Sequence, residues 1–112
     1  MKPSRSNDPL FRALPLQHRP GLRLVGELDL STIGDLRAMV DTLPEGADVF
    51  DLSDLSFMDV CGLHAVQQYA RTLDGSSPLV LENVPRQIRQ LFEVTGADQD
   101  PGIELRSEND RG

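Results

Sequence analysis

Residues 51–63 read Asp-Leu-Ser-Asp-Leu-Ser-Phe-Met-Asp-Val-Cys-Gly-Leu, and this segment indicates how the whole chain is built. It begins inside a short apolar run, residues 47–52, of the kind that forms a central strand covered in part on both faces. A short loop then carries Phe57, Met58 and Asp59. From about residue 60 the apolar positions recur with the period of a helix. The segment therefore predicts a buried strand, a loop and a helix that runs to residue 73.

Two strands are predicted upstream, at residues 10–17 and 22–28, because apolar residues alternate there and turn residues lie between them. Pro20 and Gly21 suit that turn, so the two strands form an antiparallel hairpin. Pro15 places the first strand at an edge of the sheet. One face of this first strand carries Leu10, Leu14 and Leu16.

Two helices are predicted from apolar stripes on either side of the residue 47–52 strand. The first follows residue 29, is capped by Ser31 or Thr32, and ends at residues 44–46. Its buried side carries Ile33, Leu36, Val40 and Leu43. The buried side of the helix that begins near residue 60 carries Leu63, Val66, Ala70 and Leu73.

The last third of the chain repeats this alternation. Residues 79–81 form a buried strand, Asn83 and Pro85 open a third helix, and Gly96 ends it. The buried side of this helix carries Ile88, Leu91, and Val94 or Thr95, and a final edge strand carries Ile103 and Leu105.

The order of elements predicts an α/β fold. Right-handed crossovers make strands joined by helices parallel, so the sheet is small and mixed: an N-terminal antiparallel hairpin, then β-α-β-α-β-α-β, with the helices mainly on one face. We assign residues 10–106 to this domain, and residues 1–9 and 107–112 to flexible tails.

Composition excludes several classes of function. With 112 residues there is room for one domain, and a net charge of −7 argues against nucleic-acid binding. There is no long apolar run for membrane insertion and no signal-peptide core, so we expect a cytoplasmic protein. Cys61 is the only cysteine, and His18 and His64 are the only histidines. We therefore expect no disulfide, metal site, cofactor or catalytic site.

Two separated motifs, Gly-Glu-Leu-Asp-Leu at residues 26–30 and the segment at residues 51–63, resemble the STAS domain family. The best-known small members are bacterial anti-sigma factor antagonists, also called anti-anti-sigma factors. The resemblance covers about residues 10–105. It implies a non-enzymatic regulator of transcription that acts by partner switching, docking on an anti-sigma factor that is also a serine kinase and thereby freeing a sigma factor.

In that family the loop before the second helix usually reads Asp-Ser-Ser-Gly-Leu or Asp-Ser-Thr-Gly-Leu, and the kinase phosphorylates the first serine. Here Asp59, Gly62 and Leu63 match the pattern, but Val60 stands at the phosphorylated position and Cys61 at the next. Valine has no oxygen to accept a phosphoryl group, so no phosphorylation is expected there. The resemblance implies a partner-binding loop made of Asp59, Val60, Cys61 and Gly62, with Glu27 and Asp29 matching the family's acidic pair.

Several alternatives remain open at this point. Asp59 can contact a partner or cap the second helix, and Asp29 can cap the first. Cys61 is either a reactive thiol or a small substitute for serine. Ser53 and Ser56 are either turn formers or other phosphoacceptors. The protein can also be an accessory subunit that binds the ATPase of a lipid-transporting ABC system, or an enzyme that uses Cys61 as nucleophile. We expect a monomer or a weak homodimer.

Overall fold

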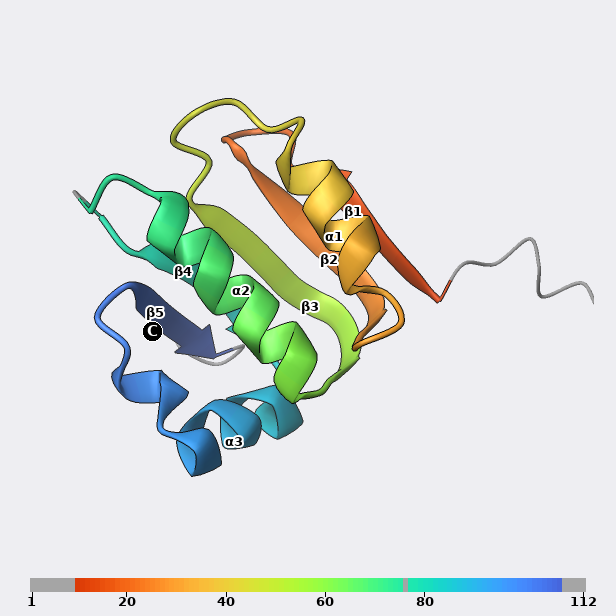
Figure 1. Cartoon of the computed structure of the whole chain (residues 1–112), viewed down its shortest axis with the longest axis vertical. Coiled ribbons are helices and arrows are strands. Elements are labelled where there is room, and N and C mark those ends of the chain that lie inside the picture. Colours follow the sequence, from red (N-terminus) through yellow and green to blue (C-terminus); the bar gives the residue numbers. More distant parts are fainter. Residues whose placement is uncertain (1–9, 76, 108–112) are drawn as a thin grey trace, which may run out of the picture.

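A five-stranded sheet with helices packed against one of its faces makes up the molecule (Figure 1). The structure is a computed structural model that describes residues 10–75 and 77–107, so the tails expected at residues 1–9 and 108–112 lie outside the described residues. In chain order the elements are β1 (Phe11–Pro15), β2 (Gly21–Leu28), α1 (Ile33–Val40), β3 (Val49–Met58), α2 (Val60–Thr72), β4 (Leu79–Val84), α3 (Arg86–Thr95), the short 3-10 helix η2 (Ala97–Gln99) and β5 (Ile103–Ser107).

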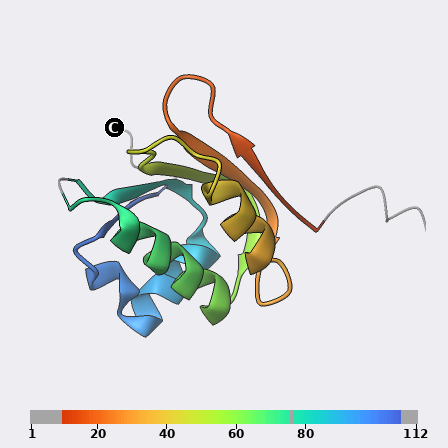
Figure 2. The same cartoon turned by 45° about the horizontal axis from the view of Figure 1, so that its top comes forward.

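The strands lie in sequence order, β1-β2-β3-β4-β5. β1 pairs with β2 antiparallel, and the other three pairings are parallel. Figure 2 shows α1, α2 and α3 together below the sheet, whereas the turn between β1 and β2 rises on the other side. The predicted mixed α/β fold, with its N-terminal hairpin and helices on one face, is confirmed.

The core lies between the sheet and the helices. Leu22 and Leu24 of β2 are fully buried toward the helices, whereas Arg23 between them is exposed. Phe50 and Leu52 of β3 continue this layer. Alternate side chains of a strand point to opposite faces, so the sheet has one apolar face and one that carries charges.

β3 is longer than the prediction of a strand at residues 47–52 followed by a loop. It runs from Val49 to Met58, and Asp59 alone separates it from α2. Its pairing with β2 shifts register twice, which marks bulges. The bulges interrupt the simple alternation, so that Leu55 and Met58 are buried although polar residues intervene.

In β1 the buried residue is Phe11, and Leu10 and Leu14, which the sequence placed on one face of the strand, are exposed. Three smaller predictions at the ends of elements were wrong. In α3 the buried positions are Ile88 and Phe92, and Val94 is 81% exposed. Asn83 belongs to β4 rather than to the start of α3, and Ser107, assigned to a tail, ends β5. The prediction for Gly96 is confirmed: it ends α3 with a left-handed φ of 80°.

Candidate functional site

Asp59 connects the ends of two parallel strands with the start of α2. Its carboxylate Oδ1 accepts a hydrogen bond from the Gly62 backbone N–H at 2.8 Å, which is the geometry of a helix N-cap. Its other oxygen, Oδ2, accepts the backbone N–H of Leu30 at 3.3 Å. The Asp59 N–H in turn donates to the Leu28 carbonyl. The capping interpretation of Asp59 is confirmed, and the same side chain also holds the loop after β2.

Gly62 allows α2 to approach β2 closely. A Cβ atom at this position would lie 2.4 Å from the carbonyl oxygen of Leu28 and 3.0 Å from that residue's Cγ. The first distance is too short for a side-chain carbon and involves a backbone atom, whereas the second is a tight contact with a side chain. A glycine is therefore required where the first turn of α2 crosses the end of β2.

The loop between β2 and α1 is held by side-chain hydrogen bonds. Asp29 Oδ1 accepts from the backbone N–H of Ser31 at 3.0 Å and from its hydroxyl at 2.7 Å. The hydroxyl bond is the main reason that the pKa of Asp29 lies below its ordinary value. The buried hydroxyl of Thr32 donates to the Glu27 carbonyl and accepts from the Asp29 N–H. Of the two predicted cap residues, Thr32 rather than Ser31 lies at the N-cap of α1, but its side chain makes no cap hydrogen bond. The Asp29 carboxylate accepts from Ser31, in the turn before the helix.

Three apolar side chains next to Asp59 are exposed, and we call them the Asp59 patch: Leu30, Phe57 and Val60. Their exposed fractions are 68%, 48% and 45%. The backbone N–H of Leu30 donates to Asp59, Val60 follows Asp59 directly, and Phe57 precedes it by two residues. Exposed apolar side chains next to one another on the surface are a typical feature of a protein-binding site.

The structure brings the six predicted site residues to one end of the sheet. Asp59, Val60, Cys61 and Gly62 are contiguous, Asp29 precedes Leu30, and exposed Glu27 lies opposite Phe57 in the pairing of β2 with β3. Cys61 is partly buried. Leu30 and Phe57 were not predicted as site residues, because nothing in the sequence distinguishes an exposed leucine or phenylalanine from a core residue.

The two serines of β3 do not form turns. Ser53 and Ser56 lie inside the strand and are exposed, and the Ser56 hydroxyl donates to the Gly26 carbonyl at 3.0 Å. His64 is exposed on α2. Within residues 10–75 and 77–107, no group of three or more His, Cys, Asp or Glu side chains could hold a metal ion. None of the helices in the same part of the chain is both long enough and apolar enough to cross a membrane.

Two comparisons with known proteins found matches to this chain. A family model described as "Mlab, STAS domain" matches residues 16–107. The solved structure of the anti-sigma factor antagonist SpoIIAA in its unphosphorylated form has a similar fold, with a TM-score of 0.62 and 24% sequence identity over 88% of this chain and 89% of that one. No curated protein matches the chain.

Proposed function

The chain belongs to the STAS domain family, and we propose that it is a regulatory module of the anti-sigma factor antagonist type. It docks on an anti-sigma factor and so frees a sigma factor. The Asp59 patch is the observation that carries this proposal, because it presents exposed apolar side chains on a loop held by the two hydrogen bonds of Asp59. Similarity of fold to SpoIIAA, an anti-sigma factor antagonist, supports the same role.

Val60 is the centre of the proposed interface. It lies in the first turn of α2, is 45% exposed, and has no hydroxyl group. A phosphate at this position would place about two negative charges in an apolar contact. We infer that docking is not switched off by phosphorylation of this loop, and that Val60 keeps the protein in the binding form. This role belongs to the cytoplasm and needs no catalysis by the protein itself.

A charge substitution at Val60 tests the interface. The partner is first recovered with the full chain from a lysate of its own cells and identified by mass. Val60→Asp should then weaken its affinity by about tenfold or more, because an unpaired carboxylate would be buried on docking. Val94→Asp is the matched control, since Val94 is exposed on α3, outside the Asp59 patch, and its substitution should leave the affinity unchanged.

Equal binding of the Val60→Asp and wild-type proteins would show that this loop is not the interface. Recovery of an ABC ATPase in place of an anti-sigma factor would support the transporter accessory role instead.

Phosphorylation is tested separately with the recovered kinase and ATP. The wild-type protein should take up no phosphate at residues 59–62, whereas Val60→Ser should gain a phosphoacceptor at residue 60. If the wild-type protein takes up one phosphate per molecule on residues 59–62, the inference that this loop is not a phosphorylation switch is wrong.

A further inference from the structure

Two apolar side chains are exposed at the edge of the sheet where β1 lies (Figure 1). The exposed fraction is 61% for Leu10, directly before β1, and 39% for Leu14, within it. Phe11 is buried toward the helices, so Leu10 and Leu14 lie on the face of the sheet that carries no helix, which we call the open face. They lie outside the Asp59 patch, and the proposed function does not account for their exposure.

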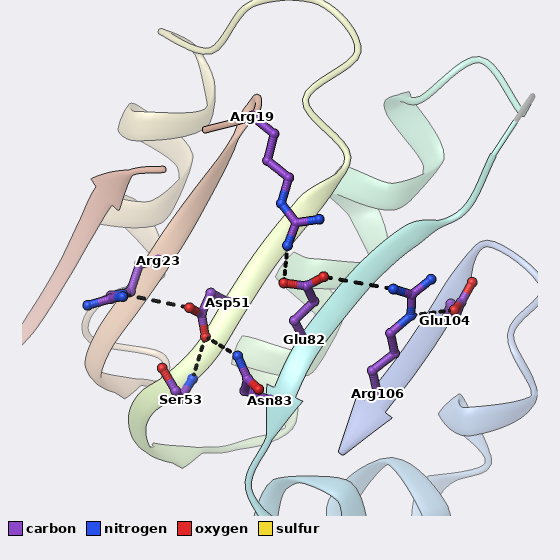
Figure 3. A network of polar contacts seen from close by, with 8 residues as sticks. All are labelled: Arg19, Arg23, Asp51, Ser53, Glu82, Asn83, Glu104 and Arg106. Atoms are coloured by element: carbon purple, nitrogen blue, oxygen red, sulfur yellow. Dashed lines mark hydrogen bonds and ion pairs between the residues drawn. The ribbon is translucent and has the colours of Figure 1, made fainter. Parts of the chain in front are cut away.

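Elsewhere the open face is charged (Figure 3). Its side chains form ion pairs with one another: Arg23 with Asp51, Arg19 with Glu82, and Arg106 with Glu104. Arg19, Arg23 and Glu82 also border a pocket of about 520 Å³, whose wall at β1 includes Leu14. Because these charges already neutralise one another, the apolar side chains at β1 are the part of the open face best suited to contact another protein.

The backbone of β1 also has hydrogen-bonding groups that face outward. The Leu16 N–H donates to the Gly21 carbonyl at 3.0 Å, and the Glu27 N–H donates to the Leu10 carbonyl at 2.9 Å. In an antiparallel pair such bonds occur at every second residue, so the even-numbered residues from 10 to 16 face β2. The odd-numbered residues of β1 direct their backbone groups away from the sheet: Phe11, Ala13 and Pro15. No strand lies beyond β1 in the part of the chain that the structure describes, so this edge can accept a further strand.

A second copy of β1 fits this edge when it pairs antiparallel about a two-fold axis at Ala13. The Ala13 N–H of each copy then donates to the Ala13 carbonyl of the other, and each Phe11 N–H donates to the other copy's Pro15 carbonyl. Pro15 has no N–H, so this pairing satisfies every outward N–H group of β1 and leaves only the Phe11 carbonyl to water.

The side chains favour this register over the neighbouring one. With the axis at Ala13, Arg12 lies opposite Leu14 of the other copy, with Cα atoms about 4.5 Å apart, and the exposed leucines of both copies lie on the same face. With the axis at Arg12 the backbone would pair equally well, but the two Arg12 side chains would lie directly opposite each other. Like charges in that position destabilise a sheet.

We propose that two copies of this chain associate through β1 into one continuous sheet, antiparallel about a two-fold axis at Ala13. The helices of both copies lie on the same side of that sheet. The interface consists of backbone hydrogen bonds between two five-residue strands and a few leucine side chains, so it is small and the dimer is weak. The proposal does not depend on the proposed function, because it involves neither the Asp59 patch nor an anti-sigma factor.

Sedimentation velocity of the full chain measures the association. The buffer contains about 0.15 M salt, which screens the repulsion between chains of net charge −7. We expect a monomer–dimer equilibrium with a Kd of about 10⁻⁴ M, as for interfaces of small area. A chain that stays monomeric up to about 1 mM would overturn the proposal.

Hydrogen exchange of single amides, measured by NMR, shows where the two copies meet. The Phe11 and Ala13 N–H groups should exchange about threefold more slowly at about 1 mM chain than at about 50 µM, because most chains are then in dimers. Exchange at Arg12 and Leu14, whose N–H groups face β2 in the monomer and in the dimer, should not depend on concentration. A dimer in which Phe11 and Ala13 exchange equally fast at both concentrations would have its interface elsewhere and would contradict the proposal.

Substitutions on the open face test the register. Leu14→Arg should raise the Kd of the dimer by about tenfold or more, because each new guanidinium would lie opposite Arg12 of the other copy. Val94→Arg is the matched control: it makes the same change of charge at an exposed position of α3 and should leave the Kd unchanged.

Adding Arg12→Glu to Leu14→Arg should bring the Kd back to within about threefold of wild type, because opposite charges then face each other across the axis. If the added substitution restores no affinity, the pairing about Ala13 is wrong. The same conclusion holds if Val94→Arg weakens the dimer as much as Leu14→Arg does, because net charge and not this edge would then govern association.

Discussion

Gly62 and Asp59 fix the first turn of α2 against the end of β2, and each acts through a few atoms. The hydrogen atom at the Gly62 Cα is the only substituent that the Leu28 carbonyl tolerates, since a Cβ would lie 2.4 Å from it. The Asp59 carboxylate bonds to a backbone N–H on either side, one in α2 and one at Leu30. The position of Val60 on the surface depends on both residues.

Gly62→Ala should lower the free energy of unfolding by about 2 kcal/mol or more, because α2 must move away from β2. Gly34→Ala is the control. Gly34 lies in α1 with nothing within 4 Å of a Cβ, so alanine there should stabilise the protein by up to about 1 kcal/mol. Urea unfolding followed by circular dichroism measures both. A Gly62→Ala protein as stable as wild type would contradict the close approach.

Asp59→Ala should lower the free energy of unfolding by about 1–2 kcal/mol, because a helix cap is lost together with the bond to Leu30. Asp35 offers a comparison, since it is an exposed acidic residue in the first turn of α1 with a favourable helix-dipole interaction. Asp35→Ala should therefore remove about 0.5 kcal/mol. If urea unfolding shows equal losses for the two variants, the Asp59 hydrogen bonds contribute nothing beyond its charge.

At the level of elements, β3 and β4 are joined by a side-chain bond as well as by their backbones. Asn83 of β4 has a positive φ of 56°, which is rare for a residue with a side chain, and its amide donates to Asp51 of β3 at 3.2 Å. The pairing of β4 with β5 shifts register between Leu81 and Val84, around this residue. Asparagine suits the position because it tolerates the left-handed conformation and supplies the donor.

Substitution of Asn83 by two small residues separates these effects. Asn83→Gly loses the hydrogen bond but accepts the positive φ, whereas Asn83→Ala loses the bond and is strained as well. Asn83→Ala should therefore be less stable than Asn83→Gly by about 1 kcal/mol. If the free energy of unfolding of both variants depends equally on urea concentration, the difference between their urea midpoints measures the free energy of the strain. If the Asn83→Ala protein is as stable as the Asn83→Gly protein, β4 rearranges at this residue and relieves the strain.

For the whole molecule, acid stability should depend in part on Asp51. Burial of the Asp51 carboxyl raises its pKa, but hydrogen bonds from Ser53 and Asn83 and the charge of Arg23 outweigh burial, so the pKa lies below the ordinary value of 3.8. A carboxyl group with a lowered pKa in the folded state stabilises the fold above its unfolded pKa. That contribution is lost as the pH falls from 3.8 through the folded pKa.

We expect Asp51→Asn to have a lower free energy of unfolding than wild type at pH 7. The difference in free energy between the two proteins should become smaller as the pH falls below 3.8. Thermal unfolding from pH 7 to pH 2 measures the gap. Other carboxylates, including Asp29, titrate in both proteins, so the difference isolates Asp51. A gap that stays constant over this range would show that the pKa of Asp51 is the same in the folded and unfolded states.

Much of the architecture could be predicted from periodicity. The apolar spacing identified α1, α2 and the order of elements along the chain, and the Asp59-to-Leu63 motif located the N-cap of α2 and the glycine that follows it. The full length of β3 could not be predicted, because Ser53, Asp54 and Ser56 resemble a loop and become strand only by pairing with β2 through two bulges. Likewise, Phe92 is buried and Val94 is exposed because of the side of α3 that packs against the sheet.

The amino-acid sequence alone determined the features that act over a few residues: the helix and strand periods, the Asp59 cap and the absence of a hydroxyl at Val60. Tertiary structure decided that Leu30, Phe57 and Val60 are exposed together, and that Arg19, Arg23 and Glu82 border one pocket. The reason is physical. Hydrogen bonds within a turn or a helix are set by neighbouring residues, whereas exposure and charge pairing depend on strands that are distant in the chain and meet only in the folded sheet.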